Sequence, residues 1–190
     1  MSKKIIKENL RKILLEKKGD THDYGCAMLL LNIPKTEWDK LQSMIDDDDI
    51  YTEEGDSSYG REDEPHITLL YGLDSDIADE EIEKVSKKLE KCTVNLKKIS
   101  IFENEKFDVL KFDIIDDTKK ELSKLNKEYA KFPHTTDYPN YHPHATLCYL
   151  KAGTGKKYIQ TLPKDKQITI ECDTVKYSKA DGSAINYKLK

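Results

Sequence analysis

The 190-residue sequence lacks an apolar run long enough to cross a bilayer. Its longest apolar run covers residues 26–31, whereas a membrane-spanning helix needs about 20 apolar residues. Residues 1–18 contain no signal-peptide core, because Lys and Glu interrupt the segment. We therefore expect a cytoplasmic protein with no membrane partner.

Cysteine and arginine are both scarce. The four cysteines form no Cys-x-x-Cys pair, which argues against a zinc knuckle and for free thiols in a reducing cytosol. Of the 32 Lys and Arg residues, only Arg11 and Arg61 are arginines. The net charge of −4 gives no basic excess for gripping a long nucleic acid, so a small nucleotide held by a few local groups is favoured.

Charged residues make up 36% of the chain and apolar residues 37%. The apolar residues fall in compact runs, which indicates a folded domain with a highly charged surface. Their spacing predicts a leader helix over 3–18 and a strand–helix–loop–strand–helix–strand order that occurs twice. The expected strands cover 25–33, 66–71, 94–102, 109–115, 144–150 and 168–172, with a hairpin over 175–189. The expected helices cover 34–45, 79–91, 118–132 and 156–162.

The two halves of the chain share a seven-residue motif. Residues 65–71 are Pro-His-Ile-Thr-Leu-Leu-Tyr and residues 143–149 are Pro-His-Ala-Thr-Leu-Cys-Tyr, identical at five of seven positions with an offset of 78. Chance similarity between two apolar strands rarely matches His and Thr in the same phase. The match therefore indicates an internal repeat.

The motif places a histidine and a threonine on one face of each strand, because residues i and i+2 point the same way. His66 and Thr68 project together, as do His144 and Thr146, and a pseudo-twofold axis would bring all four to one cleft. Two histidines with pKa values of about 6.5 can supply the base and the acid for phosphodiester cleavage. Threonine hydroxyls can hold the non-bridging phosphate oxygens. This chemistry needs no metal and no cofactor.

Two alternatives apply to these histidines. A single His-x-Thr strand is more simply a structural histidine with a satisfied hydrogen bond, but the matched pair disfavours that interpretation. A zinc site is the other alternative, since His134 and His142 lie near His144. It would need a further protein ligand, and no carboxylate stands at a matching spacing.

The doubled motif resembles that of the 2H phosphoesterase superfamily. That superfamily includes RNA 2′,3′-cyclic phosphodiesterases, 2′-5′ RNA ligase-like enzymes and phage anti-CBASS phosphodiesterases. The resemblance covers roughly residues 24–187. Residues 23–26 (Asp-Tyr-Gly-Cys) and 137–139 (Asp-Tyr-Pro) with Tyr141 are most similar to the phage enzymes. The resemblance to the phage enzymes implies hydrolysis of cyclic di- and trinucleotide signals of bacterial defence. This would take place in the host cytoplasm if a phage encodes the protein.

The resemblance implies an α+β fold with a pseudo-twofold, two antiparallel sheets lining a central cleft, helices outside and an amphipathic N-terminal helix. Residues 1–22 would form this helix and a linker. Residues 23–190 would form one bilobal domain with halves of roughly 23–104 and 105–190. His66 and His144 become the acid–base pair and Thr68 and Thr146 the phosphate holders, while the choice of base stays open.

Four further residues are candidate substrate contacts. Tyr24 could stack on a base, although packing at a strand end suits it equally. Arg61 could clamp a second phosphate or remain solvated. Glu171 could accept a hydrogen bond from a purine, and Tyr141 is implied by the resemblance.

Other residues near the motifs are assigned to packing or to the surface. Tyr71 and Tyr149 lie at odd spacing from the histidines, so we expect them on the core face of their strands. Trp38 faces the core from its helix. The acidic run 46–49 lies in a long loop over 46–64 and keeps polyanions away.

Four functions remain open at this point: a cyclic-oligonucleotide phosphodiesterase, an RNA-end enzyme, a non-catalytic nucleotide sponge and a structural or interaction protein. The net charge of −4, with no basic excess, favours a small substrate over long RNA. Intact histidines at both motifs disfavour the sponge, because binding alone needs no proton transfer. The sequence indicates no oligomeric state.

Overall fold

The computed structural model describes residues 24–54, 59–114, 118–135, 140–161 and 168–190, so the expected leader helix lies outside it. The helices and strands that we expected among these residues are present. The main difference is that α3 ends at Ser86 instead of continuing to residue 91. The elements are β1 (Gly25–Leu30), α2 (Lys35–Gln42), β2 (His66–Leu73), α3 (Asp79–Ser86), β3 (Cys92–Glu103), β4 (Phe107–Ile114), α4 (Thr118–Tyr129), β5 (His144–Lys151), α5 (Gly155–Thr161), β6 (Ile168–Cys172), β7 (Thr174–Ser178) and β8 (Ala184–Lys188).

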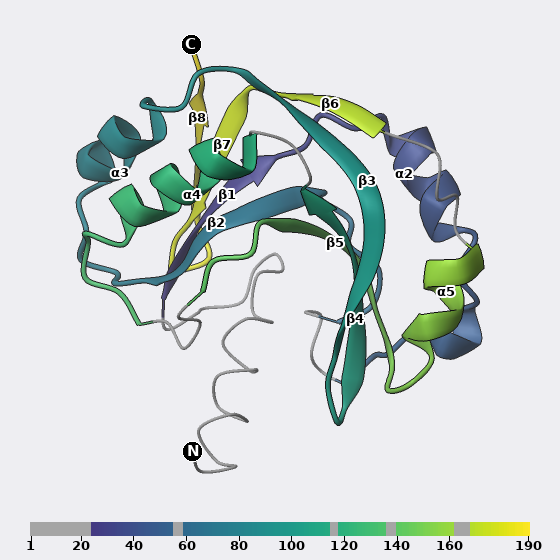
Figure 1. The fold of residues 1–190 in the computed structure, drawn as a ribbon. Coiled ribbons are helices and arrows are strands. Elements are labelled where there is room, and N and C mark those ends of the chain that lie inside the picture. The colour runs from purple at the N-terminus through teal and green to yellow at the C-terminus, as the bar shows by residue number, and fades with distance from the viewer. Residues whose placement is uncertain (1–23, 55–58, 115–117, 136–139, 162–167) are drawn as a thin grey trace.

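The strands form two four-stranded antiparallel sheets. Sheet A has the order β2-β1-β7-β8 and sheet B the order β5-β4-β3-β6. Helices α3 and α4 lie beside sheet A, and α2 and α5 lie beside sheet B (Figure 1). One apolar core draws residues from both sheets and from the helices. The expected α+β fold with two antiparallel sheets is confirmed. No helix in the described residues is long and apolar enough to span a membrane.

The two sheets do not coincide with the halves 23–104 and 105–190 that we expected as lobes. Strand β3 from the first half pairs with β4 and β6 in sheet B. Strands β7 and β8 from the second half lie in sheet A, where β7 pairs with β1. The expected boundary falls in the short β3–β4 turn, where antiparallel neighbours follow each other directly. Each sheet is therefore built from both halves of the chain.

A helix from each half of the chain also supports the motif strand that comes from the other half. From α2 in the first half, the Gln42 side chain donates to the carbonyl of Leu147 in sheet B, at 3.1 Å. From α4 in the second half, the Asn126 side chain donates to the carbonyl of Leu69 in sheet A, at 2.8 Å. Leu69 and Leu147 are equivalent positions of the sequence repeat. The pseudo-twofold relation therefore extends from the motif strands to the helices that support them.

The segment before each motif strand runs along the edge of the other motif strand. Thr135 donates its backbone N–H to the carbonyl of Gly72 in β2, at 2.8 Å, and Tyr149 in β5 donates to the carbonyl of Gly60, also at 2.8 Å. Gly72 has a φ of +94°, and a Cβ there would lie 1.9 Å from the Thr135 oxygen, so only glycine fits. These contacts cover the exposed edges of β2 and β5.

Candidate active site

The two motif histidines begin neighbouring edge strands. His66 is the first residue of β2, at the edge of sheet A, and His144 is the first residue of β5, at the edge of sheet B. Strands β2 and β5 lie side by side where the two sheets adjoin (Figure 1). The histidines are close enough that charge on His66 lowers the pKa of His144. The structure thus brings together the two strands that the repeat singled out.

Both histidines are anchored through the same ring nitrogen. Nδ1 of His66 lies 2.8 Å from the carbonyl of Glu64, and Nδ1 of His144 lies 2.6 Å from the carbonyl of His142. A carbonyl only accepts, so each Nδ1 carries the hydrogen in the neutral ring. Nε2 is then the nitrogen that can exchange a proton with a ligand. His134 makes the same contact with the carbonyl of Phe132, so this hydrogen bond alone does not identify a catalytic histidine. The two motif histidines are distinguished by lying on adjoining strands.

The pKa of His144 departs from the ordinary value that the sequence analysis assumed. The pKa of His144 is lowered from 6.5 to about 4, mainly by burial and also by the positive charges of Lys111 and His66. The His142 carbonyl and the Asp113 carboxylate act in the opposite direction. His144 is therefore neutral at pH 7, the form that accepts a proton.

A β-bulge follows the threonine in each motif strand. In sheet A, Met28 pairs with Thr68 and Ala27 with Leu70, so Leu69 is the extra residue. In sheet B, Lys111 pairs with Thr146 and Leu110 with Cys148, so Leu147 is the extra residue. The two bulges are 78 residues apart, the offset of the repeat.

The bulges reverse the side-chain alternation beyond the threonines. Leu69 and Leu70 are both buried, and Tyr71 then returns to the face of Thr68, where it is half-buried. Tyr149 does the same in β5. The prediction that both tyrosines face the main core is wrong, because it assumed an unbroken alternation. The expected packing nevertheless holds for Tyr149, whose ring lies 5.6 Å from those of Tyr59 and Phe107 in a second apolar cluster.

Four residues of β3 and β4 that the sequence analysis did not select also belong to this face of sheet B. Asp113 pairs with His144 across β4 and β5, and Lys111 pairs with Thr146. The Lys111 ammonium donates to Ser100 Oγ at 2.8 Å and to Asp113 Oδ1 at 2.5 Å. It also lies 4.1 Å from the centroid of the Phe102 ring.

This cluster reaches His144 directly. The Phe102 and His144 rings meet nearly at right angles, with centroids 5.0 Å apart. Burial acts to raise the pKa of Asp113, but the Lys111 ammonium outweighs it and the pKa lies below its ordinary value. The signal for the pair was present in the sequence, since Lys111 and Asp113 are polar residues at i and i+2 in an apolar strand.

Tyr24 and Arg61 do not lie beside the histidines. Tyr24 precedes Gly25, which pairs with the last residue of β2, so it lies roughly 20 Å along the strand from His66 at about 3.3 Å per residue. The Arg61 guanidinium donates to the carbonyl of Ile45 at 2.9 Å and to Asp47 at 2.6 Å. These partners lie at the end of α2, on the helix-covered side of sheet B.

Tyr141 contacts the motif strand, whereas Glu171 is remote from it. The Tyr141 hydroxyl donates to the carbonyl of Thr68 at 3.0 Å, and burial raises the pKa of this phenol. Tyr141 thereby ties the segment before β5 to β2. Glu171 is exposed on β6, at the edge of sheet B opposite to β5.

The zinc alternative finds no ligand set in the described part of the chain. No group of three or more His, Cys, Asp or Glu side chains there is placed to hold a metal ion. His134 and His144 each direct Nδ1 to a backbone carbonyl, which leaves one nitrogen apiece for any ligand.

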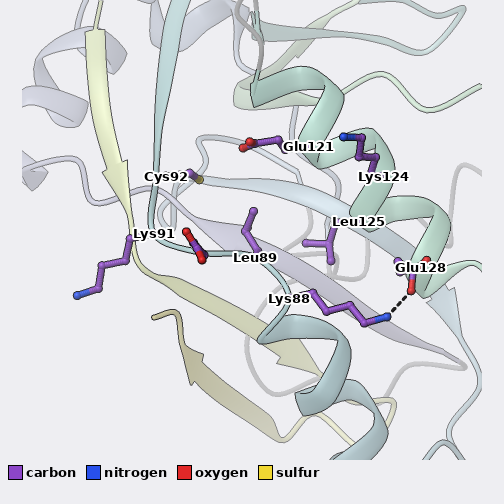
Figure 2. A pocket seen from close by; sticks show the side chains of 9 residues that line it. Lys88, Leu89, Lys91, Cys92, Glu121, Lys124, Leu125 and Glu128 are labelled. Atoms are coloured by element: carbon purple, nitrogen blue, oxygen red, sulfur yellow. Dashed lines mark hydrogen bonds and ion pairs between the residues drawn. The ribbon is translucent and has the colours of Figure 1, made fainter.

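A separate pocket of about 460 Å³ lies between α4 and the segment that joins α3 to β3 (Figure 2). Its wall mixes charges of both signs, and Lys88 and Glu128 form an ion pair there. None of the predicted site residues lines it. The lining residues are Lys88, Leu89, Glu90, Lys91, Cys92, Glu121, Lys124, Leu125 and Glu128.

Comparison with solved structures shows relatives of this fold. Usb1 from Kluyveromyces marxianus has a TM-score of 0.58 at 11% identity, covering 88% of this chain and 99% of that chain. Its structure with uridine monophosphate gives the same TM-score and identity, with 98% of that chain covered. LigT from E. coli complexed with 3′-AMP has a TM-score of 0.52 at 12% identity, covering 88% of this chain and 96% of that chain. At these identities the likeness shows the fold alone.

The sequence comparison gives the family. No curated protein matches the chain. Residues 28–183 match the family described as the 2′-5′ RNA ligase superfamily, and this range contains both His-x-Thr strands and most of both sheets. The chain therefore belongs to the 2′-5′ RNA ligase superfamily of 2H phosphoesterases.

Proposed function

We propose that the protein is a metal-independent phosphodiesterase that hydrolyses cyclic di- and trinucleotide second messengers and so counters bacterial CBASS defence. One observation carries the proposal: two histidines on adjoining strands, each anchored at Nδ1 and each followed by a threonine and a matched bulge. Phosphodiester cleavage needs one base and one acid, and this pair supplies both.

His144 is assigned as the base and His66 as the acid. The lowered pKa keeps His144 neutral at pH 7, so its Nε2 can take the proton of an attacking ribose 2′-hydroxyl. The bond from O2′ to phosphorus forms as the bond from phosphorus to O5′ breaks, and His66 Nε2 protonates the departing O5′. Water then opens the 2′,3′-cyclic phosphate with the two roles exchanged.

The phosphate charge is met by neutral and charged donors. Thr68 and Thr146 share a face with His66 and His144 and are assigned to the non-bridging oxygens. Lys111 pairs with Thr146 across the strands, so a buried positive charge lies beneath this part of the site. Charge development in the transition state is favoured by such a fixed cation.

A small substrate fits the charge of the chain. The net charge is −4, and Arg61, one of two arginines, is bound to backbone and carboxylate oxygens at the end of α2. Long RNA would require a basic surface. Uridine monophosphate and 3′-AMP, bound in the structures of Usb1 and LigT, are small nucleotides and support a substrate of this class.

The remaining assignments are also proposals. Tyr24 and Glu171 are assigned to the part of a cyclic oligonucleotide that lies away from the scissile phosphate. Tyr141 is assigned to the support of β2. Arg61 would bind a second phosphate only after leaving its present partners. Residues 1–22 as a leader and 23–190 as one domain, acting in the cytoplasm, complete the proposal.

An RNA-end activity is the second candidate. The family description names 2′-5′ RNA ligases, which favours a 2′,3′-cyclic phosphodiesterase or a ligase-like enzyme. The same two histidines would serve either reaction, so the substrate must be determined directly.

The deciding experiment incubates the protein in excess EDTA with a substrate panel and identifies products by mass. The panel contains cyclic dinucleotides, cyclic triadenylate, 2′-5′ oligoadenylate and RNA ending in a 2′,3′-cyclic phosphate. We expect cleavage of the cyclic oligonucleotides. Cleavage restricted to the RNA substrates would establish the second candidate, and binding without any cleavage would establish the sponge. Activity lost in EDTA and restored by zinc or manganese would refute the metal-independent mechanism.

A further inference from the structure

Phe102 on β3 is an aromatic side chain left partly in solvent. Among the described residues, the exposed large apolar side chains are Met44 and Phe102, with 45% and 38% of their surface accessible. Phe102 pairs with Val109 across β3 and β4, two rows from the pair of Ser100 and Lys111 and so on the same face of the sheet. It therefore stands on the face of sheet B that also carries Thr146 and His144.

The ring is held in place from behind. The Lys111 ammonium lies 4.1 Å from the ring centroid, and Ser100 and Asp113 fix that ammonium by hydrogen bonds. A cation over an aromatic face is attractive, most of all when the cation is removed from water, and Lys111 is 4% exposed. The network orients Phe102 without burying it. A binding surface whose orientation is fixed in advance loses little entropy when it takes a ligand.

The position of the ring relative to His144 suggests what the ligand is. The two ring centroids are 5.0 Å apart. A group that packs on Phe102 therefore lies beside the imidazole that is proposed as the base. In a nucleotide, the nucleobase is the flat apolar group that lies this close to a reacting ribose hydroxyl.

We propose that Phe102 is a nucleobase-binding subsite, against which packs the base of the nucleotide whose ribose hydroxyl His144 activates. The inference rests on the proposed function for the role of His144. Stacking between an aromatic side chain and a base tolerates every base, because each has a π-face. The subsite thus adds affinity and orientation with little base preference.

The test compares ligands with and without a base. Isothermal titration calorimetry measures the binding of 3′-AMP, ribose 5-phosphate and inorganic phosphate to the wild type, Phe102→Leu and Phe102→Trp. Leucine keeps an apolar group and removes the π-face, so 3′-AMP should bind about 5- to 150-fold more weakly, the range expected for one stacked base. Binding of ribose 5-phosphate and phosphate should be unchanged, and Phe102→Trp should bind 3′-AMP at least as tightly as the wild type.

Met44→Leu is the matched control, since Met44 is the other exposed large apolar residue and follows α2 on the helix-covered side of sheet B. It should leave all three affinities unchanged. Wild-type affinity of Phe102→Leu for 3′-AMP, or an equal loss for ribose 5-phosphate, would overturn the subsite. The measurement needs no turnover. If Phe102→Leu selectively loses 3′-AMP binding but the wild type cleaves none of the substrates, the proposed function is refuted and the subsite is kept. If Phe102→Leu is active and binds 3′-AMP with unchanged affinity, the subsite is refuted and the proposed function is kept.

Discussion

Exchanging Lys111 or Asp113 should move the pKa of His144 in opposite directions. Lys111 lowers that pKa by its positive charge, whereas Asp113 raises it. Lys111→Met removes the charge and keeps the length of the side chain, so the pKa of His144 should rise above about 4. Asp113→Asn removes the negative charge opposite His144, so the pKa should fall further.

The size of the shift follows from the geometry around Phe102. The ammonium is 4.1 Å from the Phe102 centroid, and that centroid is 5.0 Å from the centroid of His144. The charge therefore lies within about 9 Å of the imidazole, where Coulomb's law gives about 0.5 kcal/mol in water and about 2 kcal/mol at an effective dielectric constant of 20. We expect Lys111→Met to raise the pKa of His144 by roughly 0.3 to 1.4 units, since one unit corresponds to about 1.4 kcal/mol.

The assay is an NMR titration of the imidazole resonances, with the His144 signal assigned by its loss in His144→Gln. Lys106→Met is the matched control, because Lys106 also lies over aromatic rings, Tyr51 and Tyr59, but is not among the groups that shift the pKa of His144. It should leave the titration unchanged. Shifts of the same sign in Lys111→Met and Asp113→Asn, or no shift in either, would refute the electrostatic argument.

The same pKa sets two pH dependences. A neutral base is required, so the acidic limb of kcat/KM should lie near pH 4 in the wild type and move to higher pH in Lys111→Met. Folded His144 binds a proton less readily than the unfolded chain. Its contribution to stability is therefore fully present above about pH 6.5 and is lost as the pH falls toward 4.

The remaining predictions concern the threonines, the histidines and one glycine. Thr68→Val and Thr146→Val should each lower turnover by about 10- to 1,000-fold at unchanged melting temperature, and wild-type turnover would leave the hydroxyls without a role. His66→Ala and His144→Ala should each abolish cleavage while calorimetry still detects nucleotide binding, with the double variant scarcely worse than either. Gly72→Ala should lower the free energy of unfolding in urea by more than Gly153→Ala does. Both glycines have positive φ, but a Cβ at Gly153 meets nothing within 4 Å.

Most helices and strands could be predicted because their apolar spacing is a local property. The spacing of residues 109–115 and 144–150 identified strands in the right places, and the seven-residue repeat identified the two strands that meet. Periodicity does not say which strand is the neighbour of which. The exchange of β3 into sheet B, and of β7 and β8 into sheet A, depends on how the whole chain packs, so the expected lobes followed the sequence halves instead.

The site was predictable as far as the alternation of each strand was regular. His66 and Thr68 precede the bulge, so the i, i+2 rule held for them; Tyr71 follows it, so the rule failed. Lys111 and Asp113 were visible as a polar pair, but their relation to His144 requires the register between β4 and β5.

The matched positions of the repeat show how far residue identity predicts the face of a side chain. Within the motif, Ile67 stands where the second copy has Ala145, and both are fully buried. The matched polar residues, by contrast, are His, Thr and Tyr, and the bulge places all three on one face of each strand. Core positions tolerate exchange of apolar residues when the surroundings repack, whereas a shared ligand site demands the same polar group twice. Identity alone nevertheless does not assign a face, because Leu69 and Leu147 are also identical and are fully buried. The bulges decide the face of each tyrosine, and they are visible only in the register of the strands.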